Sequence, residues 1–76
     1  MFSPQEEDVL KVIGRKKITI ADIAAALVKE PTVDHNNSIA GCIRRINRKC
    51  EKLQLDWIID GEGMGRQGRT VWRKKL

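Results

Sequence analysis

With 76 residues, 41% of them hydrophobic, the chain is predicted to form one small folded domain over residues 1–76, and this composition argues against disorder of the whole chain. No segment approaches the roughly 18–20 apolar residues of a membrane span, and the acidic N-terminus lacks a secretion signal, so a cytoplasmic protein without a membrane partner is expected. The net charge of +5 is uneven, because residues 1–34 hold five basic and six acidic side chains, whereas residues 35–76 hold ten and four. This asymmetry is typical of a domain that presents one basic face to a polyanion.

Helix-capping signals come first along the chain. The segment Ser3-Pro4-Gln5-Glu6 combines an N-cap, a proline in the first turn and the glutamate of a capping box. These residues predict a helix over about residues 4–13.

A second start signal begins at Thr19, which can cap a helix that Pro31 ends. A very short strand is expected at Lys17 and Ile18, just before this helix. The turn after it is expected to run to about Asn36.

The third segment predicts a helix over about residues 37–53 with two distinct faces. At about 100° per residue, the apolar side chains fall in one arc that predicts a core face: Ile39, Cys42, Ile43, Ile46, Cys50 and Leu53. The opposite face presents Asn37, Gly41, Arg44 and Arg48, with Arg45 and Lys52 on one flank. The helix is therefore expected to present a basic ridge to solvent.

The two cysteines of this segment, Cys42 and Cys50, lie about 12 Å apart along a helix at 1.5 Å per residue. That separation is too large for a disulfide or a shared zinc ion, so both are predicted to be reduced and buried. With His35 as the single histidine and no phosphate-binding or metal-ligand motif, neither an enzyme nor a metal or cofactor site is expected.

The C-terminal segment predicts a β-hairpin with strands over residues 55–60 and 69–74. Between them, four glycines predict a long loop, and Arg66 and Arg69 lie in this candidate wing of residues 61–69. With Arg73 on the second strand, these side chains are expected to contact DNA phosphates or the minor groove.

Taken in order, these elements predict an α+β fold of the winged helix-turn-helix class, three helices followed by a C-terminal β-hairpin wing. A major groove about 12 Å wide admits one α-helix, whose exposed side chains then reach base edges. The sequence therefore predicts a double-stranded DNA-binding module acting in transcription regulation. Arg44, Arg45 and Arg48 are its expected guanine readers, and Asn37 is its expected adenine reader.

Two segments resemble the output domain of OmpR/PhoB-type transcription regulators. Phe2-Ser3-Pro4-Gln5-Glu6 is similar to the opening Thr-Pro-x-Glu segment of that domain, and Ile43-Arg44-Arg45-Ile46-Asn47-Arg48-Lys49 is similar to its recognition helix. The resemblance implies DNA contacts by Ser38, Arg44 and Arg45, and places Asn47 where the family often has arginine. Small phage or plasmid regulators share the same outline.

The main alternative is a winged helix that serves as a protein-interaction module, with its basic ridge on an acidic partner or domain. Structured RNA is a further alternative, although the sequence predicts no aromatic-rich sheet of the RNA-recognition type. Membrane-surface binding is disfavoured because the third helix uses its apolar face for the core.

Overall fold

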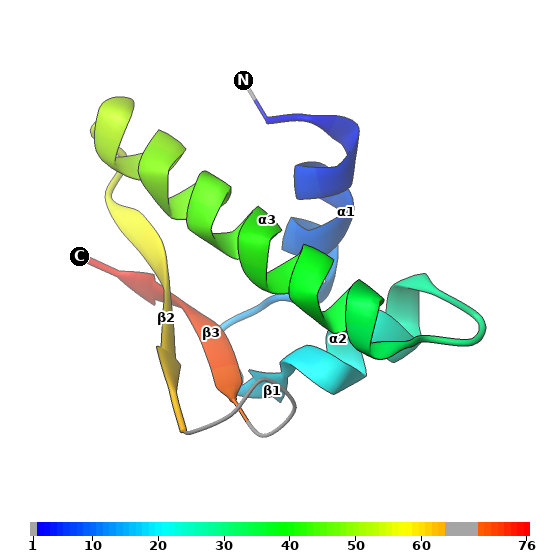
Figure 1. The fold of residues 1–76 in the computed structure, drawn as a ribbon. Helices are drawn as coiled ribbons and strands as arrows, with labels where there is room; N and C mark the ends of the chain where they lie inside the picture. The colour runs from blue at the N-terminus through cyan, green and yellow to red at the C-terminus, as the bar shows by residue number, and fades with distance from the viewer. Residues whose placement is uncertain (1, 64–68) are drawn as a thin grey trace.

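The computed structural model describes residues 2–63 and 69–76, which form an α+β fold of three helices and a three-stranded antiparallel sheet (Figure 1). In chain order the elements are α1 (Pro4–Val12), β1 (Ile18–Thr19), α2 (Ile20–Leu27), α3 (Val33–Lys52), β2 (Trp57–Glu62) and β3 (Thr70–Lys75). The strands lie in the order β1-β3-β2, so the short β1 completes the sheet beside the last strand of the chain. This architecture confirms the coarse part of the prediction, an α+β fold with three helices and a C-terminal β-hairpin.

The first two helices begin where their caps predict. Ser3 Oγ accepts a hydrogen bond from the Glu6 N–H at 3.3 Å, and the Ser3 N–H donates to Glu6 Oε1 at 2.9 Å, which completes the capping box. Thr19 Oγ1 accepts from the Asp22 N–H at 3.0 Å at the start of α2. The expected short strand lies at Ile18–Thr19, one residue later than predicted.

Helix α3 begins at Val33, so the prediction of a turn reaching Asn36 and a helix starting near residue 37 was wrong. The cause is a local contact in which His35 Nδ1 accepts a hydrogen bond from the Thr32 N–H at 2.9 Å. His35 therefore stabilises the first turn of the helix.

The other end of α3 is closed by a residue in the left-handed region. Gln54 has φ 56°. This turn lets the Leu55 N–H donate to the Cys50 carbonyl at 2.9 Å, a carbonyl that has no partner within the helix. The helix ends at Lys52, and Leu53 is exposed instead of joining the core as predicted.

The hairpin strands differ from the predicted ranges because the pairing extends further into the glycine-rich segment. Gly61 pairs with Val71 and Glu62 pairs with Thr70, so both residues belong to β2, although they were assigned to the wing loop. The expected wing of residues 61–69 is thus reduced to residues 63–69. Of these, residues 64–68 lie outside the described residues, and Arg66 with them.

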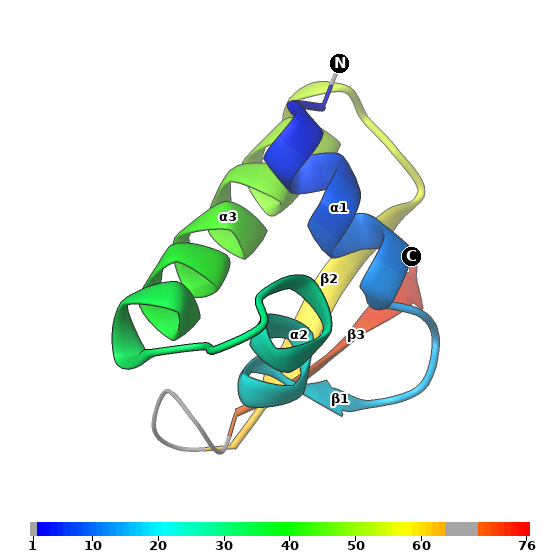
Figure 2. The same ribbon diagram turned by 90° about the vertical axis from the view of Figure 1, so that its right-hand side faces the viewer.

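Helix α3 crosses α1 and α2 and lies over the β2–β3 hairpin (Figures 1 and 2). The buried core draws on every helix and on β2 and β3: Val9, Ile13, Ile20, Ile23, Ala24, Ile39, Cys42, Ile43, Ile46, Cys50, Ile59 and Val71. Both cysteines are free and buried as predicted, and burial raises the pKa of each thiol. Among the described residues, no helix combines the length and the apolar character that crossing a bilayer requires.

Candidate nucleic-acid interface

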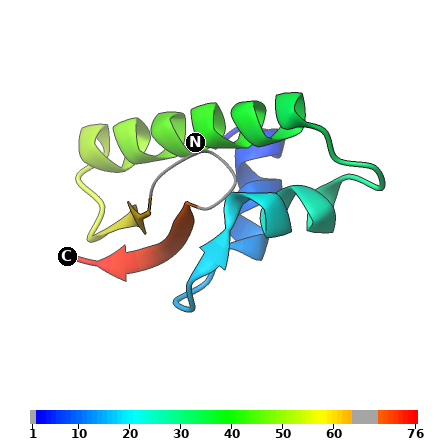
Figure 3. The same ribbon diagram turned by 60° about the horizontal axis from the view of Figure 1, so that its bottom comes forward.

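Helix α3 presents one face to solvent along its length, on the side opposite its buried isoleucines (Figure 3). We call this the outer face of α3, and its members are Asn37, Gly41, Arg44, Arg48 and Lys52. Four of the five residues are exposed and Gly41 is half-buried. None of the three cations forms an ion pair with a described residue.

Gly41 lies at the middle of the outer face. A Cβ atom built at this position would contact only Arg45 Nη1, at an ordinary distance of 3.8 Å. Glycine inside a helix costs about 1 kcal/mol relative to alanine. The packing of the described residues therefore does not require a glycine at this position.

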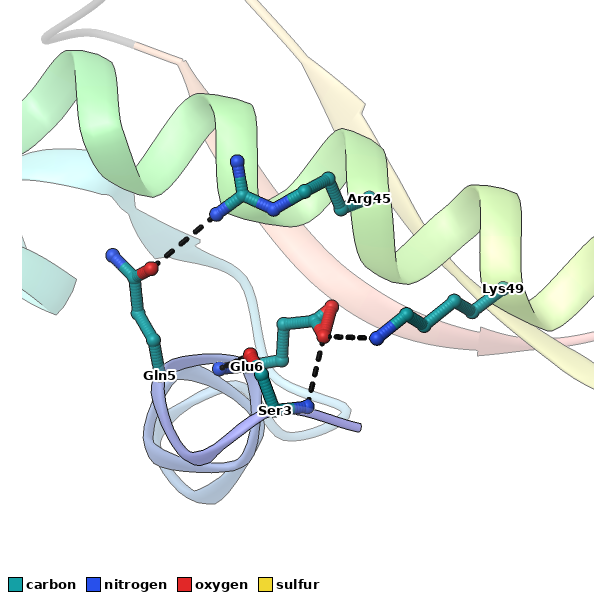
Figure 4. Close-up of polar contacts among 5 residues, drawn as sticks. All are labelled: Ser3, Gln5, Glu6, Arg45 and Lys49. Carbon is teal, nitrogen blue, oxygen red and sulfur yellow. Dashed lines mark hydrogen bonds and ion pairs between the residues drawn. The ribbon is translucent and has the colours of Figure 1, made fainter. Parts of the chain in front are cut away.

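Ser38 and Arg45 lie on the flank of α3 that faces α1, where Gln5 connects them. Arg45 Nη2 donates to Gln5 Oε1 at 3.3 Å (Figure 4). Gln5 Nε2 in turn donates to Ser38 Oγ at 3.1 Å. Both α3 side chains remain exposed. The contact turns the Arg45 guanidinium toward the N-terminal helix, so the structure separates this arginine from Arg44 and Arg48.

Next to this flank, the buried carboxylate of Glu6, 2% exposed, is paired with Lys49, so the charge of Lys49 does not add to the basic surface. Glu6 forms an ion pair with Lys49 Nζ and also caps α1 through Ser3 (Figure 4). The hydrogen bond from Lys49 is the main cause that lowers the pKa of Glu6 to about 2. Lys49 Nζ also lies 5.8 Å from the centre of the Phe2 ring. The sequence analysis missed this pair, because nothing local to either residue shows that residues 6 and 49 meet.

A cleft of about 620 Å³ separates the N-terminal half of α3 from the end of the hairpin. Its lining residues are Ile20, Asn37, Ala40, Arg44, Gly61, Glu62, Gly63 and Arg69. The cleft therefore brings Arg69, from the predicted wing, to the same site as Asn37 and Arg44 from α3.

Arg73 is the predicted contact residue that the structure places elsewhere. Its Nη2 donates to the Leu10 carbonyl at 3.0 Å, and its guanidinium lies 4.8 Å from the centre of the Trp57 ring. The side chain is half-buried between the end of α1 and β2. The contacts connect the sheet to α1 and leave Arg73 remote from the outer face of α3.

No protein-family description, curated protein or solved structure matches the chain in comparisons with known proteins. Within residues 2–63 and 69–76, no three His, Cys, Asp or Glu side chains are grouped to hold a metal ion.

Proposed function

We propose that this domain binds double-stranded DNA as a winged helix-turn-helix and acts in transcription regulation. In this proposal α2 and α3 form the helix-turn-helix, the outer face of α3 enters the major groove, and the β2–β3 hairpin is the wing. The element order of helix, short strand, two helices and hairpin supports the assignment.

The observation that carries the proposal is the composition of the outer face. It combines two exposed arginines, Arg44 and Arg48, with a central glycine that the fold itself does not need. An α-helix with its side chains is about 10–12 Å across, which matches a major groove about 12 Å wide. Because Gly41 has no side chain, the α3 backbone can come close to the floor of such a groove. Arg44 and Arg48 can then reach bases and phosphates.

Arg48 and Asn37 are the residues we assign to base reading. Both are exposed, and neither has a hydrogen-bond partner among the described side chains. Arginine can donate two parallel hydrogen bonds to guanine, and an asparagine amide can both donate to and accept from adenine. Each such pair contributes about 1–3 kcal/mol of discrimination against the wrong base.

The proposal is tested by incubating the purified domain with a pool of random duplexes and sequencing those retained. Enrichment of a common sequence by the wild type, lost in Arg48→Ala, is the expected result. Lys11→Ala is the matched control, because it removes an exposed cation from α1 and should leave enrichment unchanged.

Two other outcomes would contradict the proposal in different ways. Retention without sequence enrichment would reduce the function to electrostatic DNA binding. No retention even at low salt, by a protein that is folded, would contradict DNA binding and favour a winged-helix module that binds an acidic protein.

A further inference from the structure

Two arginines from distant parts of the chain line one cleft without an acidic partner. Arg44 reaches the cleft from α3, and Arg69 reaches it from the residue before β3. The three ion pairs among the described residues include neither of them. Two uncompensated guanidinium groups at one concave site favour an anionic ligand, and a volume of about 620 Å³ lies within the usual range for ligand sites of about 300–1,000 Å³.

Gly61 lets Arg69 take its position at this cleft. A Cβ atom at Gly61 would lie 2.9 Å from Arg69 Nε, closer than real Cβ contacts, and at tight distances of 3.1 Å from Arg69 Nη2 and 3.3 Å from the Thr70 carbonyl oxygen, so Arg69 would have to shift. Gly61 is paired with Val71 in β2 and does not have a positive φ, so its backbone conformation does not demand glycine. The missing side chain leaves room for the Arg69 guanidinium to lie beside the backbone of β2.

The acidic residue of the cleft is neutralised by a separate cation. Glu62 pairs with Lys17, whose ammonium group also lies 5.0 Å from the centre of the Trp72 ring. Because side chains alternate along a strand, Glu62 and Gly61 belong to opposite faces of β2. Glu62 still lines the cleft, but its carboxylate is paired with Lys17.

We propose that this cleft binds a phosphodiester group of the nucleic-acid backbone between Arg44 and Arg69, with Gly61 as the positioning residue for Arg69. The inference rests on the proposed DNA-binding function. It predicts that Arg44 contacts a phosphate of the DNA backbone and not a base. Arginine suits this role because its planar guanidinium can donate two hydrogen bonds to one phosphate.

The test uses the duplex selected by the wild type, with single phosphates replaced in turn by neutral methylphosphonates. One replacement should weaken wild-type binding about tenfold, the usual loss for a hydrogen bond to a charged group. Arg44→Ala and Arg69→Ala should each weaken binding to the unmodified duplex, and both should become less sensitive to that same replacement. Because they share one ligand, the double variant should lose clearly less affinity than the product of the two single losses.

The outcomes separate this inference from the function on which it rests. If the two variants lose sensitivity at different phosphates, or if their losses multiply, the shared site is wrong while DNA binding stands. If the wild type retains no duplex, both proposals are overturned.

A second arm tests Gly61 as a positioning residue. Gly61→Ala should weaken duplex binding several-fold, leave the urea midpoint close to that of the wild type, and have no further effect on binding in an Arg69→Ala background. Gly14→Ala is the matched control, since a Cβ there would contact nothing within 4 Å. An equal loss of binding from Gly61→Ala with and without Arg69 would show that Gly61 does not act through this arginine and would overturn its assigned role.

Discussion

Asn47 of α3 and Ile59 of β2 are joined by a pair of hydrogen bonds. Asn47 Nδ2 donates to the Ile59 carbonyl and Asn47 Oδ1 accepts from the Ile59 N–H, both at 2.8 Å. Ile59 is only 3% exposed, so its backbone has little access to water as a substitute partner. One side chain thereby holds the hairpin against the helix and fixes the two walls of the cleft relative to each other.

We expect Asn47→Ala to lower the free energy of unfolding by about 2–3 kcal/mol, because it leaves the backbone N–H and the backbone carbonyl of Ile59 unpaired. Urea denaturation followed by tryptophan fluorescence measures the change. Asn47→Asp is the informative companion, since a carboxylate can accept from the N–H but cannot donate to the carbonyl. It should be destabilised as well, and wild-type stability in either variant would show that the pair does not support the fold.

Much of the fold could be predicted because its signals are local. The capping box of Ser3 and Glu6 and the Thr19 cap depend on residues three apart, and the apolar arc of α3 follows from helical periodicity alone. The start of α3 was missed because histidine is not a usual capping partner, and its end because Gln54 takes a conformation that usually favours glycine.

The site was predicted less completely, because three of its polar side chains are committed to partners far away in sequence. Arg45 contacts Gln5, Lys49 contacts Glu6, and Arg73 contacts Leu10 and Trp57. Periodicity shows only that a side chain leaves the core face. It cannot show which neighbouring element receives that side chain, so Arg45 and Arg73 were predicted to be as available as Arg44 and Arg48.

The Glu6–Lys49 ion pair predicts a loss of stability in acid. The pKa of Glu6 is lowered from 4.5 to about 2 in the folded protein, so the fold favours the carboxylate. The stabilisation is fully present above about pH 4.5 and is lost as the pH falls toward 2. Urea midpoints measured across this range should therefore fall more steeply for the wild type than for Glu6→Gln, which keeps a capping oxygen without the charge.

The control for that comparison is Glu7→Gln, which changes an exposed neighbour in the same helical turn. It should retain the pH dependence of the wild type. At neutral pH, Glu6→Gln should be less stable by about 1–3 kcal/mol, because a charge-assisted hydrogen bond is lost. Parallel pH profiles for wild type and Glu6→Gln would contradict the assignment.

Substitution of Gly41 should change stability and duplex binding in opposite directions. Gly41→Ala should raise the free energy of unfolding by about 0.8–1 kcal/mol, since alanine is the better helix former and its Cβ meets no obstacle. Duplex binding should weaken about tenfold, equivalent to about 1.4 kcal/mol, if DNA approaches the helix backbone at this point. Ala26→Gly in α2 is the reciprocal control: it should lower stability by a similar amount and leave binding by the folded protein unchanged. Stabilisation of Gly41→Ala without loss of binding would place the interface elsewhere.

Arg48 and Arg73 are both basic residues of the C-terminal half, but their surroundings predict opposite consequences of removal. Arg48 is exposed and has no described partner, so Arg48→Ala should change stability by no more than about 0.5 kcal/mol. Its loss should appear as reduced preference for one base pair, by about 1–3 kcal/mol between matched and altered duplexes.

Arg73→Ala removes the donor to the Leu10 carbonyl and the cation over the Trp57 ring, so it should lower the free energy of unfolding by about 1–3 kcal/mol. Arg73→Lys keeps the charge but not the planar group, so it should recover only part of that stability. Urea denaturation and binding to matched and scrambled duplexes, measured on the same preparations below the unfolding transition, distinguish the two roles. If Arg73→Ala were as stable as the wild type and lost DNA binding, this arginine would belong to the interface and the sequence-based assignment would hold. The contacts of its guanidinium group favour the opposite result, because a side chain already bound to α1 and the sheet can reach a phosphate only by leaving both.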